Sequence, residues 1–279
     1  KLGKEVIAAY ADYEQLVGGV DTLFKDSSQE IQRYAANAYK TAGLSANEYM
    51  ETVTGFSASL IQSLGGDTEK AAKYADMAIT DMSDNANKMG TDMSSIQNAY
   101  QGFAKQNYTM LDNLKLGYGG TKQEMERLLA DAEKISGVKY DISSYADVVE
   151  AIHVMQESMD IAGTTAKEAE ATISGSVNAL KSAVSNLIVG FGDADADMEL
   201  LCNNMVDAFK TVVANITPVI ENIVAALPTA LDALLTAVGE LLPTLLEAVT
   251  ELFSQVLETL LSLLPQLIPA AVSALMTIV

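Results

Sequence analysis

The side chains in this sequence that could carry out acid–base or metal chemistry are few and scattered. The only histidine, His153, follows Glu150 by three residues and precedes Glu157 by four. On one face of a helix, an imidazole and two carboxylates could contact a metal ion. The chain offers no second cluster of ligands, so we favour a solvated polar face as the interpretation. We therefore predict no metal-binding residues.

Two short runs look like ligand-binding loops. The run Gly117–Gly120 precedes a predicted helix, where glycines can hold an anion. No predicted strand precedes it and no Gly-Lys-Ser/Thr follows it, so a nucleotide site is not predicted. Asp193, Asp195 and Asp197 alternate as calcium ligands do, but they lack the loop glycine and the final bidentate glutamate. A solvated linker is the favoured interpretation.

Arrangements for nucleophilic catalysis are also absent from the sequence. There is no nucleophile elbow, cysteine–histidine pairing or HExxH motif. Among 37 acidic residues some pair always has a suitable spacing, so paired carboxylates carry no information. The single cysteine, Cys202, excludes an intrachain disulfide framework and is interpreted as a small apolar helix residue. We predict no catalytic residues, no cofactor-binding residues, no cofactor and no enzymatic activity.

The composition predicts an all-α protein. Hydrophobic residues make up 49% of the chain, but aromatic residues only 6%, with no tryptophan. The apolar surface therefore comes mostly from Ala, Leu, Val, Ile and Met, which suit helix–helix packing. Only Val138–Ser143 could form a strand, and it is too short to carry a sheet. The net charge of −20 argues against specific nucleic-acid binding, which draws its affinity from Lys and Arg.

We predict that residues 1–190 form about eight amphipathic helices, arranged as an elongated set. Capping boxes indicate the helix starts; they are Ser27 with Glu30, Ser45 with Glu48, Thr121 with Glu124, and Thr165 with Glu168. Glycines indicate the ends; they are Gly18–Gly19, Gly43, Gly65–Gly66, Gly90, Gly137 and Gly163. Residues 107–121 are predicted to form a loop that leads into a helix.

Methionines follow the apolar face of the helix predicted for residues 69–89. Ala72, Ala75 and Met82 recur at helical spacing and indicate one buried stripe. Met77 and Met89 continue this stripe, and Met93 follows it. A methionine row can form an adaptable binding surface, but at this spacing we favour core packing.

The composition changes after Lys210. Residues 191–210 are predicted to form an acidic linker and a helix start, and residues 211–279 a hydrophobic helical region. From Thr211 to Val279 there is no Lys, Arg or His, and all five prolines of the chain lie here. We predict a series of kinked or broken helices, because proline removes a backbone hydrogen bond.

The acids of this second region share one side of a helix with the prolines. At about 100° per residue, both sets project onto an arc of roughly 140°, and Leu, Val, Ile and Ala fill the rest. The uncharged stretch Thr259–Val279 is long enough to cross a bilayer, which needs about 20 residues. A helix buried in an oligomer has the same composition, so both interpretations stay open.

Three blocks of sequence resemble one family. They are GLSANEYMETVTG at Gly43–Gly55, DMSDNANKMG at Asp81–Gly90, and FAKQNYTMLDNLKLGYGGT at Phe103–Thr121, the last being the most specific. These blocks resemble the tail tape measure proteins of long-tailed bacteriophages and prophages. The hydrophobic region after Lys210 also looks like that family. The chain begins at Lys1 without a methionine and stops inside an apolar stretch, so we expect a fragment of a longer polypeptide.

The resemblance implies a structural protein that occupies the tail tube lumen of the virion, sets tail length during assembly and leaves ahead of the DNA. Its hydrophobic region would aid passage through the host membrane. The implied partners are a few copies of itself, the tail tube protein, tail tip or baseplate proteins, tail assembly chaperones and the host membrane. A helical pore-forming or membrane-disrupting protein is the alternative, because it would share the apolar second region. A hydrolase domain elsewhere in the full gene also stays open.

Overall fold

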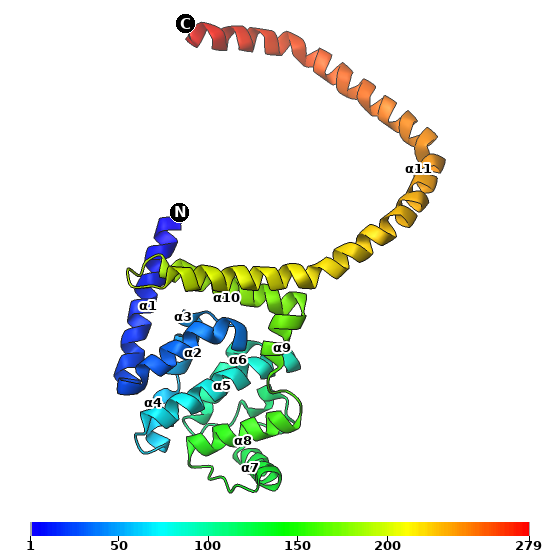
Figure 1. The fold of residues 1–279 in the computed structure, drawn as a ribbon. Coiled ribbons are helices and arrows are strands. Elements are labelled where there is room, and N and C mark those ends of the chain that lie inside the picture. The colour runs from blue at the N-terminus through cyan, green and yellow to red at the C-terminus, as the bar shows by residue number, and fades with distance from the viewer. Residues whose placement is uncertain (1, 279) are drawn as a thin grey trace. The chain divides into compact units, whose positions relative to one another are not determined.

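A computed structural model describes the backbone of residues 2–278 and the side chains of residues 3–240, 242–244, 246–263 and 265. Within these residues the chain is all α-helical and contains no strand, as predicted (Figure 1). It divides into two units, Lys1–Thr217 and Pro218–Val279. The division follows Thr217, whereas the composition changes after Lys210, so the acidic linker of residues 191–210 belongs to the first unit.

Ten α-helices precede residue 191 in the described part of the chain, compared with the eight or so indicated by the sequence. The elements in chain order are α1 Leu2–Phe24, α2 Ser28–Thr41, α3 Ala46–Thr54, α4 Ser57–Ser63, α5 Thr68–Met89, α6 Met93–Phe103, α7 Lys122–Ser136, α8 Tyr145–Ser158, α9 Thr164–Ala171, α10 Ile173–Gly190 and α11 Met198–Ile278. Two short 3₁₀ turns, Lys25–Ser27 and Leu111–Leu114, lie between them. The predicted loop at residues 107–121 is confirmed, apart from the second of these turns.

Helix α5 lies at the centre of the first unit and contacts α1, α2, α3, α4, α6, α8 and α9. The predicted stripe is confirmed, because Ala72, Ala75 and Met82 are 0% exposed. Alanine side chains let neighbouring helix backbones approach closely, which explains how one helix can have so many neighbours. Met77, Met89 and Met93 are partly buried against the same core, so the methionine row serves in packing.

Two of the predicted capping side chains are confirmed by the structure. Ser45 and Glu48 form a complete capping box at α3. Thr121 caps α7 by accepting a hydrogen bond from the backbone of Glu124, although the Glu124 side chain bonds elsewhere. The helix start predicted at Ser27 is confirmed, because α2 begins at Ser28. Its capping box is wrong, because the Ser27 hydroxyl contacts that of Thr68, and Glu30 pairs with Arg33.

The predicted capping box at Thr165 and Glu168 is also wrong. Thr165 lies inside α9 and is buried, so its side chain cannot precede the helix. The N-terminus of α9 is capped by Asp84, a fully buried residue of α5. The two carboxylate oxygens of Asp84 accept hydrogen bonds from the backbone amides of Gly163 and Thr165, at 2.6 and 2.7 Å.

Most of the predicted helix ends are confirmed. Gly90 and Gly137 are left-handed caps of α5 and α7, and Gly43 and Gly65–Gly66 adopt positive φ after α2 and α4. Gly18–Gly19 is an exception, because α1 continues through both residues to Phe24. A glycine inside a helix costs about 0.5–1 kcal/mol, which the packing of α1 on α2 and α3 can outweigh. Gly163 is the other exception, because it immediately precedes α9 instead of ending α8.

The helix α11 runs without a break through all five prolines of the chain. The predicted breaks therefore do not occur in the described backbone. The described prolines, Pro218, Pro228, Pro243 and Pro265, are exposed, so water can reach the carbonyl groups that each proline leaves without an amide partner. Residues 138–143, the only strand candidate, include no strand.

Candidate functional site

From Pro218 onward, every side chain that the structure describes is exposed. We call the described Leu, Val, Ile and Phe side chains between Val219 and Leu263 the apolar surface of α11. Leu234, Leu235 and Phe253 are 60%, 64% and 67% exposed, respectively. Contiguous apolar patches on soluble monomers seldom exceed a few hundred Å². A surface of this kind indicates contact with a partner or with a membrane, and it is the candidate functional site.

The acids of the second unit lie on one side of this surface. Glu221, Asp232, Glu240, Glu247, Glu251 and Glu258 are all exposed. Because α11 is continuous, the rotation of about 100° per residue applies along its whole length and gathers these acids within roughly 120°. The helix therefore combines a narrow acidic side with a broad apolar one.

One stretch of α11, Met198–Glu240, is long and apolar enough to cross a membrane, judged by length and composition. Its most apolar 18-residue window has a mean hydropathy of 1.5, and none of that window is buried. Most of the predicted bilayer segment, Thr259–Val279, lies outside the residues whose side chains are described. The bilayer segment predicted at Thr259–Val279 therefore stays a prediction, beside the candidate span Met198–Glu240.

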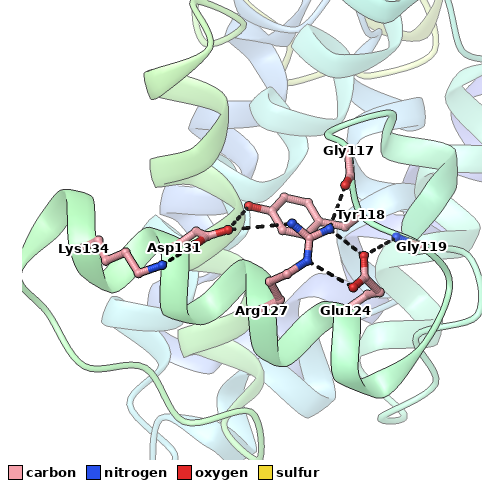
Figure 2. Close-up of polar contacts among 7 residues, drawn as sticks. All are labelled: Gly117, Tyr118, Gly119, Glu124, Arg127, Asp131 and Lys134. Carbon is pink, nitrogen blue, oxygen red and sulfur yellow. Dashed lines mark hydrogen bonds and ion pairs between the residues drawn. The ribbon is translucent and has the colours of Figure 1, made fainter.

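The glycine-rich loop before α7 is held by a carboxylate of the chain itself (Figure 2). The Gly119 amide donates to Oε2 of Glu124 at 2.9 Å, which is the contact that a phosphate oxygen would make. Arg127 donates to the same carboxylate at 2.6 Å and to the carbonyl of Gly117 at 2.8 Å. Hydrogen bonds from Arg127 and Gly119 lower the pKa of Glu124 to about 2. These contacts fasten the loop to α7.

Tyr118 extends this network along α7. The Arg127 guanidinium lies over the Tyr118 ring, 4.2 Å from its centroid, and the Tyr118 hydroxyl donates to Asp131 at 2.9 Å. Lys134 contacts the same aspartate at 2.8 Å, as Figure 2 shows. The pKa of Tyr118 is raised to about 12, mainly by burial and secondly by the hydrogen bond to Asp131. The polar side chains of this network bond to one another and to the loop backbone, so we assign the loop a structural role.

His153 contacts a buried aspartate that the sequence did not indicate. Its Nδ1 lies 2.9 Å from Oδ1 of Asp81, a residue of α5 that is 1% exposed. Its Nε2 lies 3.5 Å from Glu157, whereas Glu150 accepts a hydrogen bond from Tyr74 at 2.5 Å. The predicted solvated face is therefore only half correct, because one ring nitrogen points into the protein.

The electrostatics of this pair follow from its burial. Burial raises the pKa of Asp81 to about 6, although the bond to His153 opposes that rise. The hydrogen bond to Asp81 raises the pKa of His153, although burial opposes it.

Within the described residues, no group of three or more His, Cys, Asp or Glu side chains is arranged to hold a metal ion.

The other chemically suggestive residues make local contacts. Asp193 accepts a hydrogen bond from the amide of Asp195 at 3.0 Å, and Asp197 accepts one from the amide of Leu200 at 2.9 Å. The first bond stabilises a turn and the second caps α11, which fits the interpretation as a linker. Cys202 is an exposed free thiol in the first turns of α11.

No protein-family model, curated protein or solved structure matches this chain. The apolar surface of α11 is the candidate site because of its exposure and its chemistry.

Proposed function

We propose that this chain is a segment of a bacteriophage or prophage tail tape measure protein. The observation that carries the proposal is the uninterrupted helix α11 with its exposed apolar surface, which follows an acidic helical unit. The resemblance of the three blocks between Gly43 and Thr121 supports it independently. In this role the protein occupies the tail tube lumen, sets tail length and is not an enzyme.

A ruler needs a fixed relation between residue number and length. An α-helix rises about 1.5 Å per residue, so the 81 residues of α11 span about 120 Å along the helix axis. The first unit is a compact set of helices around a shared core, so its residues contribute far less length each. We therefore assign the ruler role within this chain to α11.

The width of the apolar surface favours association of several copies. In a two-stranded coiled coil each helix buries only a narrow seam. Acids and prolines occupy roughly 140° of α11, so an apolar arc of roughly 220° remains, which needs more than one neighbour to cover it. A few copies of α11 with their acids outward would bury this arc. Tube, tip or baseplate proteins and assembly chaperones would surround that bundle.

The same surface can serve during ejection. Apolar side chains that leave the bundle could turn toward the lipid of the host membrane, while the acidic side lines a wet path. An acidic lining would not retain the DNA that follows, because like charges repel.

The test is a change of length within α11 of the complete gene. Removing residues 219–254 takes out ten helical turns and keeps the helix in phase, so tails should shorten by about 54 Å. Duplicating the same residues is the matched control and should lengthen tails by about 54 Å. Electron microscopy of purified tails measures both. Tails of unchanged length in both variants would rule out the ruler role for α11.

The exposed apolar surface also favours a second candidate, a helical pore-forming or membrane-disrupting protein. Such a protein should release dye from liposomes without any tail component. Dye release by the purified chain, together with unchanged tail length in the two variants, would move the assignment to this class.

A further inference from the structure

A cavity of about 180 Å³ lies within the first unit, among α1, α2, α3, α10, the loop that leads into α11 and the first turn of α11. Its walls include Ala35, Met50 and Val189, which are at most 9% exposed. An apolar cavity of about 150 Å³ in another protein binds benzene. This one therefore has room for an apolar group the size of a leucine or phenylalanine side chain.

The side-chain amide of Asn186 lines this cavity and has an N–H donor without a partner among the described residues. Asn186 is 7% exposed, and its Oδ1 accepts a hydrogen bond from the amide of Ala46 at 2.7 Å. This bond fixes which end of the side chain is oxygen, so Nδ2 points the other way. Among the described residues, Nδ2 has no acceptor within hydrogen-bond distance. Asn186 can therefore donate from Nδ2 to a ligand that brings an acceptor such as a carbonyl oxygen.

Two carboxylates also line the cavity. Asp193 and Asp197 each use Oδ1 to accept a backbone amide of the loop or of α11. Neither forms an ion pair with a Lys or Arg of the described chain, so both negative charges are available to a ligand. The cavity thus combines an apolar interior, polar side chains that include the Asn186 donor, and an acidic edge.

We propose that this cavity binds a peptide segment of a partner protein. An apolar side chain of that segment fills the cavity, its backbone carbonyl accepts from Asn186, and an adjacent Lys or Arg pairs with Asp193 and Asp197. A segment without Lys or Arg, such as residues 211–279, would leave both carboxylates unpaired. Anionic lipid is disfavoured, because the acidic edge repels its headgroup.

The experiment uses the full chain and three capped dipeptides. Saturation-transfer NMR detects weak ligands, and here the probes are acetyl-Leu-Arg amide, acetyl-Leu-Glu amide and acetyl-Gly-Arg amide. We expect the Leu-Arg probe to bind at least about threefold more tightly than either of the others, because each lacks one element of the match. Equal responses from all three would overturn the proposal. Stronger binding of hexanoate than of the Leu-Arg probe would also overturn it, by assigning the cavity to acyl chains.

Three variants locate the site without disturbing the core. Ala36 is exposed on α2 and lines the cavity, so Ala36→Leu should narrow the entrance and abolish the leucine signal of the Leu-Arg probe. Ala171→Leu makes the same change at an exposed position outside the cavity and should have no effect. The double variant Asp193→Asn/Asp197→Asn keeps both Oδ1 acceptors but removes the charges, so the Leu-Arg probe should bind about threefold to tenfold more weakly. An unchanged leucine signal in Ala36→Leu would place the probe elsewhere and overturn the proposal.

Discussion

At the scale of single residues, the pair of His153 and Asp81 makes the first unit sensitive to pH. Both groups have raised pKa values in the folded protein, Asp81 chiefly through burial and His153 chiefly through its bond to Asp81. A group with a raised pKa binds its proton more tightly in the folded state than in the unfolded state. Folding therefore takes up protons at this pair, and stability should fall as the pH rises.

The sign can be followed group by group. Asp81 has an ordinary pKa of 3.8 and a folded pKa of about 6. Between these two pH values the unfolded state loses this proton more readily than the folded state, so the stability of the folded state falls as the pH rises. The favourable contribution of His153 is fully present below its ordinary pKa of 6.5 and is lost as the pH rises through its raised folded value. The free energy of unfolding should thus be greater at pH 6 than at pH 8.

We predict that His153→Gln flattens this pH profile above pH 6.5 and lowers stability at pH 6 by about 1 kcal/mol, because a neutral amide makes a weaker hydrogen bond than an imidazolium. All 11 tyrosines lie in the first unit, so the tyrosine band of the near-ultraviolet circular dichroism spectrum reports this unit alone during urea unfolding. Glu157→Gln is the control. Its side chain is 60% exposed, and we expect a change below about 0.5 kcal/mol. A steep profile above pH 6.5 in His153→Gln would assign the effect to other groups.

At the scale of elements, the start of α9 depends on a carboxylate from α5. Replacing Asp84 by alanine leaves the partly buried amide of Gly163 and the buried amide of Thr165 without their acceptors. We predict a loss of about 2–4 kcal/mol in the free energy of unfolding. Asp84→Asn keeps one acceptor oxygen and should lose roughly half as much.

The matched control is another aspartate at a helix start. Asp92 precedes α6 but makes no side-chain cap to that helix, and it is exposed. Asp92→Ala should therefore change stability by less than about 0.5 kcal/mol. Hydrogen exchange adds a local measure, because amides in the first turn of α9 should lose protection only in the Asp84 variants. Equal effects at the two positions would contradict the proposed cap.

At the scale of the whole molecule, the two units differ in what they need from their surroundings. The first has its own core, and in the second every described side chain is exposed. We predict that residues 1–217 alone are folded and monomeric, with a tyrosine thermal midpoint within about 3 °C of that of the full chain. The full chain should self-associate or bind detergent. Sedimentation velocity of both forms measures this, and association of residues 1–217 to the same extent would disprove it.

The sequence by itself determined the fold class, the buried stripe of α5 and most of the helix ends. These features depend on local information, namely the helical spacing of apolar residues and the backbone freedom of glycines such as Gly90 and Gly137. The composition change near Lys210 likewise located the second region, because a stretch without cations does not depend on packing to be recognised.

Only the tertiary structure decided which distant side chains meet. Asp84 caps a helix that begins 80 residues later, and Asp81 contacts a histidine 72 residues away, so no local spacing could reveal either. Packing on neighbouring helices also carried α1 through Gly18–Gly19, against the local preference. The cavity beside Asn186 has the same origin, because its walls come from five helices and a loop whose closeness depends on how they pack.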